Sequence, residues 1–384
     1  MGTETLSRGS QDNQGNPENQ PGTTAGQQPA DQATADQQAA GLLARARALV
    51  DPALRRAVDS MPESMARVGA YHFGWREADG SPATADPGKA IRPALVLAAA
   101  EACAATRRLP AQRTGGEPAR AAVSAAAAVE LVHNFTLLHD DVIDRDDTRR
   151  HRPTAWRVFG ATEAILAGDA LHSLALRTLA EDGHPAAGSA MRRLADCVVE
   201  LCAGQQADCA FEQRSTVSLA ECLAMAEAKT GALLGAACAI GALYGGADER
   251  AAAAMDAFGR EIGLAFQLID DLIGIWGDPA VTGKPAGADL LVRKKSLPVV
   301  AALGSGTPAG AELARIYALD RPLTPEEVRQ AAEAVDRAGG RVWAQGASCE
   351  RMAAAIEHLS AAVPDPADTD DLLALAELVT RRNR

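Results

Sequence analysis

Apolar residues recur every three to five positions along most of the chain, which indicates α-helices rather than strands. The pattern begins near residue 41, where Leu42, Leu43, Ala46 and Leu49 follow this spacing. Further helices are predicted over residues 90–106, 117–145, 161–180, 188–213, 218–244, 248–276, 309–319, 324–339, 343–361 and 368–382. Segments rich in Gly and Pro separate them, and no segment alternates convincingly between apolar and polar residues. The pattern predicts one large all-α domain, a helical bundle over residues 41–384.

Residues 1–40 have a different composition. They contain eight glutamines, no aromatic residue, and only Met1 and Leu6 as large apolar side chains. Such a segment buries too little apolar surface to offset the entropic cost of ordering it. We therefore predict a disordered N-terminal tail, which is either passive or a docking or targeting segment. Composition does not separate these two alternatives.

The overall composition supports a helical protein and excludes several classes of function. Hydrophobic residues make up 47% of the chain but aromatic residues only 3%. Most of the hydrophobic residues are Ala, Leu and Val, and this composition favours helices. The net charge of −12 argues against nucleic acid as a partner. No apolar run is long enough for a transmembrane segment, and the N-terminus lacks the pattern of a secretory signal. Seven cysteines without a C-x-x-C pair predict small buried thiols and a cytoplasmic location.

A cluster of acidic residues follows the apolar part of segment 117–145. Asp140 and Asp144 are four residues apart and would share a helical face, with Asp141 beside them. Three carboxylates this close repel one another unless a cation lies between them. Oxygen ligands without cysteine favour Mg²⁺ over zinc. The alternative is a solvated acidic helix end, although aspartate at a helix C-terminus opposes the helix dipole.

A second acidic pair, Asp270 and Asp271, lies inside the strongly apolar segment 266–273. Burying two charges is costly unless a partner or a metal compensates them. Two acidic patches in one bundle therefore predict facing carboxylates that hold metal ions and a polyanionic substrate.

Basic residues accompany both acidic clusters. Lysine occurs only five times among 38 basic residues, and a compact point charge suits phosphate groups, although chance accounts for the count equally well. Arg149, Arg150 and Arg152 directly follow the first cluster, and Lys284, Lys294 and Lys295 follow the second. Lys89 and Arg92 begin another predicted helix, and Lys229 lies in the middle of one. Each alone would be an ordinary surface charge. Their joint occurrence with the acidic clusters predicts a diphosphate site.

Five ordered segments resemble the signature motifs of the trans-isoprenyl diphosphate synthases, the polyprenyl synthetase family. They are GKAIRP at 88–93, LHDDVID at 138–144 with Arg149 and Arg150 after it, KTG at 229–231, FQLIDD at 266–271, and GKP at 283–285 with KKSLP at 294–298. The resemblance covers about residues 85–300 and is strongest to a bacterial geranylgeranyl diphosphate synthase. It implies the all-α isoprenoid synthase fold, a homodimer, and a prenyltransferase that joins isopentenyl diphosphate to an allylic diphosphate.

The resemblance also implies a role for each matching residue. Magnesium, three ions with substrate, would be held by Asp140, Asp141, Asp144 and Asp270, and the catalytic set adds Asp271 and Lys229. The allylic diphosphate would contact Arg149, Lys229, Thr230, Gln267 and Lys284. Isopentenyl diphosphate would contact Lys89, Arg92, His133 and Arg150. Metal and cations would stabilise the departing diphosphate, after which the isopentenyl double bond attacks the allylic cation in a site without water.

Product length is predicted from the residues one turn before the first acidic cluster. Phe135 precedes Asp140 by five residues, about 7.5 Å along a helix. Phe135 and Thr136 would therefore limit the growing chain, although ordinary core packing is the alternative for Phe135. An aromatic residue here, with no insertion between Asp141 and Asp144, resembles the enzymes that make C20 products. This implies geranylgeranyl diphosphate, with farnesyl or a longer diphosphate as the alternative.

The chain departs from the family pattern at two positions. Gly274 stands where an acid is common in the second motif, and Asp278 is a candidate substitute one turn later. Ala90 stands where the family often has arginine.

Two further functions are weighed against a synthase. A class I terpene cyclase shares the fold, but Asp270–Asp271 and the Lys89/Arg92 signature favour a synthase with a second diphosphate substrate. The non-enzymatic alternative is a cargo protein, because residues 1–40 and the segment 71–75 resemble polyprenyl transferases packaged in family 2 encapsulin shells. That weaker resemblance implies an encapsulin shell as a partner, reached through the tail, and a location inside a protein nanocompartment. A packaged enzyme can remain active.

Overall fold

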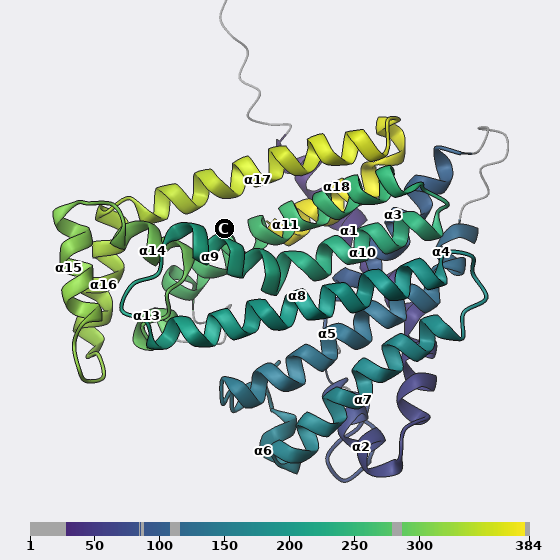
Figure 1. Cartoon of the computed structure of the whole chain (residues 1–384), viewed down its shortest axis with the longest axis horizontal. Coiled ribbons are helices and arrows are strands. Elements are labelled where there is room, and N and C mark those ends of the chain that lie inside the picture. Colours follow the sequence, from purple (N-terminus) through teal and green to yellow (C-terminus); the bar gives the residue numbers. More distant parts are fainter. Residues whose placement is uncertain (1–27, 84, 86–87, 108–115, 279–285, 381–384) are drawn as a thin grey trace, which may run out of the picture.

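The computed structural model describes residues 28–380 except 84, 86–87, 108–115 and 279–285, and places most of them in helices (Figure 1). The first half contains α1 Gln28–Asp59, α2 Glu63–His72, α3 Ile91–Ala105, α4 Glu117–Ala121, α5 Val123–Ile143, β1 Thr148–Arg149, β2 Arg152–Pro153, α6 Ala155–Phe159, α7 Ala161–Ala180 and α8 Ala187–Gln213. The second half contains α9 Leu219–Ala226, the π-helix η2 Glu227–Gly231, α10 Ala232–Tyr244, α11 Glu249–Trp276, α13 Ala288–Leu291, α14 Leu297–Leu303, α15 Pro308–Tyr317, α16 Pro325–Arg337, α17 Gly340–Ala362, the 3₁₀ helix η3 Pro366–Asp368 and α18 Asp370–Thr380.

Helix α10 lies at the centre of the bundle. All of its residues are buried, and it packs against α3, α8 and α11. The apolar segment Leu219–Tyr244, which ends with α10, is long and apolar enough to cross a membrane, but 61% of its most apolar window is buried inside the protein. Its composition is accounted for by this central position, since a core helix must be apolar on every face.

A smaller group of helices, α13 to α16, forms one end of the molecule (Figure 1). Its own core includes Leu290, Val299, Leu313 and Val335, and Ile275 from the end of α11 joins it. The end of α11 thus connects this smaller core to the main bundle.

The predicted all-α architecture is confirmed, and the predicted helix ranges agree closely with the observed helices. Ala122 interrupts the predicted helix 117–145, which becomes α4 and α5. The predicted helix 218–244 contains the π-helix η2, a local change in hydrogen bonding that apolar spacing does not reveal. The sequence did not predict α2, α6, α13 or α14, of which three are too short for a periodic pattern, nor the two-residue strands β1 and β2.

The helical region begins earlier than predicted, because α1 begins at Gln28 and not near residue 41. Ala39 is buried, and Gln38 Nε2 donates a hydrogen bond to Asp371 Oδ1 on α18 at 2.9 Å. These tertiary contacts stabilise a segment whose composition alone indicates disorder. Residues 1–27 of the predicted tail lie outside the described residues.

The prediction that the cysteines are buried holds for only part of the set. Cys103, Cys197, Cys222 and Cys238 are buried, whereas Cys202 and Cys349 are exposed. All seven are free thiols.

Candidate active site

The first acidic cluster lies at the C-terminal end of α5, and its middle residue is held by an arginine. The side chain of Asp141 is 1% exposed, and Arg149 in β1 places both Nε and Nη2 at 2.7 Å from Asp141 Oδ1. The exposed Asp144 and the partly buried Asp140 carry the remaining carboxylates. Asp141 therefore positions Arg149, while Asp140 and Asp144 are the more accessible acids.

The carboxylates of this cluster are held in an environment that disfavours their charge. Burial raises the pKa of Asp140 to about 6, with Asp144 and Asp141 adding to the rise, while Lys229 and Arg149 oppose it. Burial raises the pKa of Asp144 as well. A cation placed between these carboxylates would relieve both effects.

Lys229, on the π-helix η2, faces the first cluster. Its Nζ lies 2.5 Å from Asp208 Oδ2 on α8. Burial alone would lower the pKa of Lys229, but Asp208, Asp140 and Asp144 raise it. A π-helix turns its side chains differently from the α-helices on either side, and such insertions are frequent at functional sites.

The second acidic cluster is fixed by a chain of hydrogen bonds. Thr230 Oγ1 donates to Gln267 Oε1 at 2.8 Å, and Gln267 Nε2 donates to Asp271 Oδ1 at 2.9 Å. The backbone N–H of Leu297 donates to Asp271 Oδ2 at 2.9 Å. Asp271 is 3% exposed, and burial raises its pKa to about 6 despite these partners. The adjacent Asp270 is exposed.

Lys294 connects the two clusters. Its Nζ lies 3.7 Å from Asp271 Oδ1 and 3.7 Å from Asp289 Oδ2. Burial alone would lower the pKa of Lys294, but nearby carboxylates raise it overall. They belong to Asp271, Asp289, Asp208 and Asp270. Lys294 in turn lowers the pKa of Asp144. The acidic clusters thus face each other with Lys229 and Lys294 between them.

The next residue, Lys295, has a different position. Its Nζ donates to the carbonyl oxygen of Phe211 at 2.7 Å, near the end of α8, where helix carbonyls carry partial negative charge. Only the first of these two consecutive lysines therefore faces the acidic clusters.

The four residues predicted to bind isopentenyl diphosphate lie around the start of α3. Arg92 Nη1 is 3.1 Å from His133 Nε2 on α5. Burial, followed by the charges of Arg92, Arg150 and Arg149, lowers the pKa of His133 well below its usual value, so the imidazole is neutral. Lys89 is exposed just before α3.

Gly88 brings the segment before α3 close to Arg150. Its φ is +96°, and a Cβ at this position would lie 2.6 Å from Arg150 Nη2. Arg47 on α1 donates to the Gly88 carbonyl oxygen. The sequence did not single out Arg47, because it lies far from every motif.

The segment 71–75 belongs to the support of the site. The Tyr71 hydroxyl donates to the Pro153 carbonyl oxygen at 2.9 Å, and the Arg152 guanidinium lies 4.3 Å from the centre of the Tyr71 ring. Phe73 and Trp75 are buried and stacked at 4.5 Å. This segment fixes the β1–β2 hairpin, which carries Arg149.

The two residues predicted to set product length lie on different faces of α5. Thr136 shares the face of Asp140, four residues later, and its Oγ1 donates to the His133 carbonyl oxygen at 2.8 Å. The Phe135 ring points toward α7, with its centre 5.0 Å from that of His139 and 5.3 Å from that of His172. Their role in product length stays a prediction.

The remaining candidate residues lie in different parts of the chain. Lys284 lies outside the described residues. Asp278 follows the end of α11 at Trp276, so it does not continue the helical face of Asp270. Gly274 does lie on that face, and the carboxylate of Asp289 packs against it. Ala90 adopts a left-handed conformation with φ of 55° as the N-cap of α3.

The oxygen donors of the two clusters fit magnesium. Within the described residues, no three Asp, Glu, His or Cys side chains already form a metal site by themselves. Mg²⁺ needs only one or two carboxylates, because substrate phosphates and waters complete its coordination. Asp140, Asp144 and Asp270 can supply such carboxylates from opposite sides of the site.

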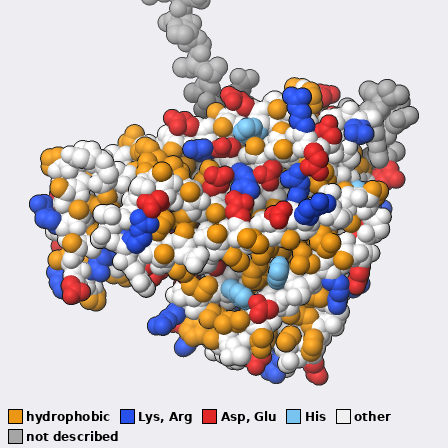
Figure 2. All heavy atoms as spheres, in the orientation of Figure 1, with side chains coloured by type: hydrophobic (Ala, Val, Ile, Leu, Met, Phe, Trp, Pro, Cys, Tyr) orange, Lys and Arg blue, Asp and Glu red, His pale blue; other side chains and the backbone are white. Residues whose placement is uncertain are grey.

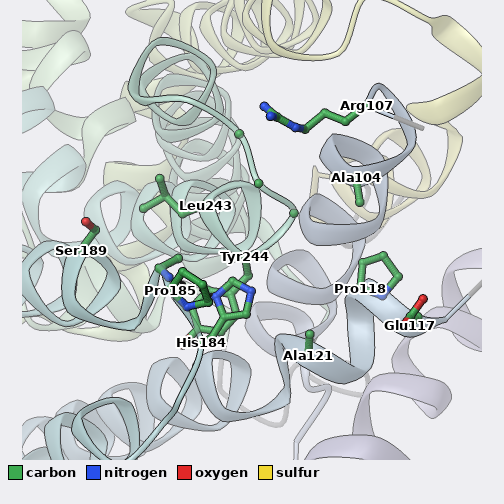
Figure 3. Close-up of a pocket in the computed structure, with 14 residues that line it drawn as sticks. Ala104, Arg107, Glu117, Pro118, Ala121, His184, Pro185, Ser189, Leu243 and Tyr244 are labelled. Atoms are coloured by element: carbon green, nitrogen blue, oxygen red, sulfur yellow. Dashed lines mark hydrogen bonds between the residues drawn. The ribbon is translucent and has the colours of Figure 1, made fainter. Parts of the chain in front are cut away.

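A cavity of about 610 Å³ lies at the other end of α10 (Figure 3). Its lining includes Arg107, Glu117, His184 and Tyr244 but none of the predicted site residues. The Tyr244 and His184 rings stack at 4.2 Å, and the Tyr244 hydroxyl donates to Asp182 Oδ2 at 2.8 Å. Without paired carboxylates, it lacks the features of a metal–diphosphate site.

Comparison with known proteins agrees with this geometry. The model of the polyprenyl synthetase family matches residues 81–335. A geranylgeranyl diphosphate synthase of Mycobacterium tuberculosis is 50% identical over 89% of this chain and 93% of its own length. A (2E,6E)-farnesyl diphosphate synthase of Mycobacterium bovis is 44% identical over 84% of this chain and 88% of its own. The crystal structure of a polyprenyl synthetase from Streptomyces coelicolor A3(2) superposes with a TM-score of 0.81 at 46% identity, covering 88% of this chain and 98% of that one.

Proposed function

The chain belongs to the polyprenyl synthetase family and is a prenyltransferase, and we propose that its main product is geranylgeranyl diphosphate. The observation that supports prenyl transfer is the pair of acidic clusters facing each other across Lys229 and Lys294, whereas the C20 length is supported by the greater similarity to a geranylgeranyl diphosphate synthase. This arrangement suits a diphosphate that leaves while metal ions and cations hold it.

The described side chains form two proposed diphosphate sites, one for each substrate. Asp140, Asp144 and Asp270 would hold Mg²⁺, which supplies positive charge to the departing allylic diphosphate. The same diphosphate would contact Arg149, Lys229, Thr230 and Gln267, with Lys284 as a further predicted contact. Asp141 is the further residue predicted to hold the metal; its Oδ1 is paired with Arg149 and its Oδ2 has no hydrogen-bond partner. Asp271, whose two oxygens both have partners, would position its neighbours.

Isopentenyl diphosphate would bind beside the start of α3. Lys89, Arg92 and Arg150 supply cations, and neutral His133 supplies a hydrogen bond without adding charge. The isopentenyl double bond attacks the allylic cation, and a proton then leaves to the released diphosphate. The protein contributes positioning, electrostatics and exclusion of water, and needs no nucleophile of its own.

A C20 product is supported by the relatives and by α5. The geranylgeranyl diphosphate synthase is more similar to this chain than the farnesyl diphosphate synthase. Thr136 lies one turn below Asp140, and Phe135 lies beside it toward α7. A chain that grows down from Asp140 would therefore meet this part of α5.

We also propose a homodimer formed through α7 and α8. Hydrophobic side chains gather on the surface over these helices (Figure 2). Ile165 and Leu166 on α7 are exposed, and Val199 on α8 is 72% exposed. Association would remove these side chains from water. Light scattering should give a mass near twice 39.8 kDa.

The cytoplasm is the proposed location, and residues 1–27 are proposed to load the enzyme into a shell. The free thiols support a reducing compartment. Removing residues 1–27 should abolish loading into a co-expressed encapsulin shell and leave turnover unchanged. A shell that loads the shortened chain equally well would contradict the packaging proposal alone.

The product is tested with labelled isopentenyl diphosphate, Mg²⁺ and C5, C10 or C15 primers, followed by phosphatase treatment and mass spectrometry. We expect a C20 product from each primer. A C15 product would identify a farnesyl diphosphate synthase, and a cyclic hydrocarbon formed without isopentenyl diphosphate would identify a cyclase.

Phe135→Ala should shift the product to longer chains, because it removes a ring beside the path of the growing chain. The cavity costs about 3–5 kcal/mol of unfolding free energy if the site does not collapse, so unfolding must be measured in parallel. Thr136→Ala is the matched variant on the Asp140 face. An unchanged product in a folded, active Phe135→Ala enzyme would remove this residue from chain-length control.

A further inference from the structure

An arginine of the first helix contacts the segment that carries the proposed isopentenyl diphosphate site. Arg47 lies on α1, and its guanidinium donates a hydrogen bond to the carbonyl oxygen of Gly88. Gly88 is 41 residues away in the sequence and directly precedes Lys89. This hydrogen bond therefore joins α1 to the start of a substrate-binding segment.

The part of α1 that carries Arg47 is firmly packed. Ala46 and Val50 are each 1% exposed and belong to the main hydrophobic core. Helix α1 also packs against α3 and α5, the helices that carry Arg92 and His133. The Arg47 guanidinium thus extends from a fixed point of the backbone toward the segment before α3.

The charge of Arg47 lies near the other cations of this site. Glu130 on α5 is 7% exposed, and burial raises its pKa. The charges of Arg92, Arg150 and Arg47 oppose that rise, so one buried acid interacts with three arginines. Gly88 contacts both Arg47 and Arg150, because a Cβ at Gly88 would lie 2.6 Å from Arg150 Nη2. Arg47 is therefore part of the same polar cluster as two residues predicted to bind isopentenyl diphosphate.

We propose that Arg47 is a positioning residue of the isopentenyl diphosphate site. It holds the Gly88 carbonyl oxygen and thereby fixes the position of Lys89 before α3. Its charge adds to the positive potential at the diphosphate, although it does not touch the reacting atoms. This inference rests on the proposed function, because it takes the site beside the start of α3 as the one for isopentenyl diphosphate.

A purely structural role for Arg47 is the competing explanation. Arg47 would then only tie α1 to the bundle, so its loss would destabilise the fold and weaken both substrates alike. A positioning role predicts a selective effect instead, because Gly88 and Lys89 belong to only one of the two proposed diphosphate sites.

The experiment compares Arg47→Met and Arg47→Lys with the wild type. Methionine keeps much of the apolar stem but cannot donate a hydrogen bond, whereas lysine keeps the charge and a donor. Arg45→Met is the matched control, because Arg45 lies on the same helix but pairs with Glu101 at 2.7 Å. Calorimetry measures the Kd of isopentenyl diphosphate without a primer, and steady-state kinetics measures the KM of each substrate.

We expect Arg47→Met to raise the Kd and the KM of isopentenyl diphosphate by about tenfold or more, the effect of losing one charge-assisted hydrogen bond. The KM of the C15 primer should stay close to that of the wild type. Arg47→Lys should recover most of the lost affinity, and Arg45→Met should bind isopentenyl diphosphate as the wild type does.

Circular dichroism checks that each variant is folded. If Arg47→Met does not fold, Arg47→Gln repeats the comparison with a neutral side chain that remains hydrophilic. An unchanged Kd in the folded neutral variant, an equal loss for both substrates, or an equal loss in Arg45→Met would overturn the proposal. A product of another length from the wild type would contradict the proposed C20 product alone, because the calorimetric measurement needs no turnover.

Discussion

The two acidic clusters use the same pair of adjacent aspartates in different surroundings. In both, the second aspartate is buried and paired, whereas the first is more accessible. Asp141 depends on one arginine from a two-residue strand. Asp271 is held by a side-chain amide one turn earlier on its own helix, and by a lysine and a backbone N–H from the segment 294–297. In each pair, the outer carboxylate is therefore the one that we propose for the metal and substrate, and the inner one holds neighbouring donor groups in place.

The clusters also differ in how they are assembled. The first is built almost entirely from residues 140–149, a continuous segment. The second combines α11, α13 and the start of α14, and its network reaches η2 through Thr230. The second cluster should therefore be more sensitive to changes in packing, and the first to changes in charge.

The largest expected effect is the loss of an outer acid. Asp140→Ala or Asp270→Ala should lower turnover by about a thousandfold, the scale seen when a preorganised charge at the reacting group is removed. The protein should remain folded, because these side chains are the more accessible members of their clusters. Steady-state kinetics with C15 primer and isopentenyl diphosphate measures the loss.

Thermal unfolding and circular dichroism are the controls for these two variants. Removing Mg²⁺ with EDTA should abolish turnover in the wild type as well. Near-normal activity of either variant in Mg²⁺ would show that the outer acid does not hold the metal, and would break the proposed division of roles.

The inner acids should differ from each other in stability. Asp271→Ala leaves the Leu297 N–H and the Gln267 amide without their acceptor in a buried place, which costs about 1–3 kcal/mol for each such group. Asp141→Ala leaves Arg149, whose side chain is 29% exposed and can reach water. Urea unfolding should therefore show a larger loss for Asp271→Ala. Equal losses would mean that the two inner acids are held equally firmly despite their different partners.

The first cluster was easier to predict from sequence than the second, for a physical reason. Spacing along one helix is enough to bring Asp140 and Asp144 together. Asp208 and Asp289 reach the site only through tertiary packing, and no local pattern distinguishes them from surface acids. The burial of Asp271 was nevertheless predicted, because a charge in an apolar segment is anomalous by itself.

Prediction of the fold from sequence was limited in the same way, by features that depend on tertiary packing. Long helices such as α8 and α11 follow directly from apolar spacing. The π-helix at Lys229 depends on how η2 packs against α8 and α11, which spacing does not record. The first part of α1 was assigned to the tail because its Gln and Ala residues carry little apolar surface, and the burial of Ala39 and the hydrogen bond of Gln38 to α18 are tertiary contacts that composition does not reveal.

The smallest expected effect is the pH dependence of stability that Asp271 causes in the metal-free protein. Burial raises its folded-state pKa to about 6, above that of an unfolded aspartate, so the folded state binds the proton more tightly. Between about pH 4 and pH 6 this carboxyl therefore stabilises the folded state less as the pH rises, by at most about 1.4 kcal/mol per pH unit. Buried His72 and His133, whose pKa values are lowered, act in the opposite direction, so the wild type alone does not isolate the effect. Asp271→Asn resembles the protonated acid at every pH and leaves both histidines in place. With EDTA present, the unfolding free energy of the wild type minus that of Asp271→Asn should fall from pH 4.5 to pH 7. A difference that stays constant over this range would mean that Asp271 ionises in the folded protein as easily as in the unfolded chain, and that its partners, unlike those of the first cluster, fully offset its burial.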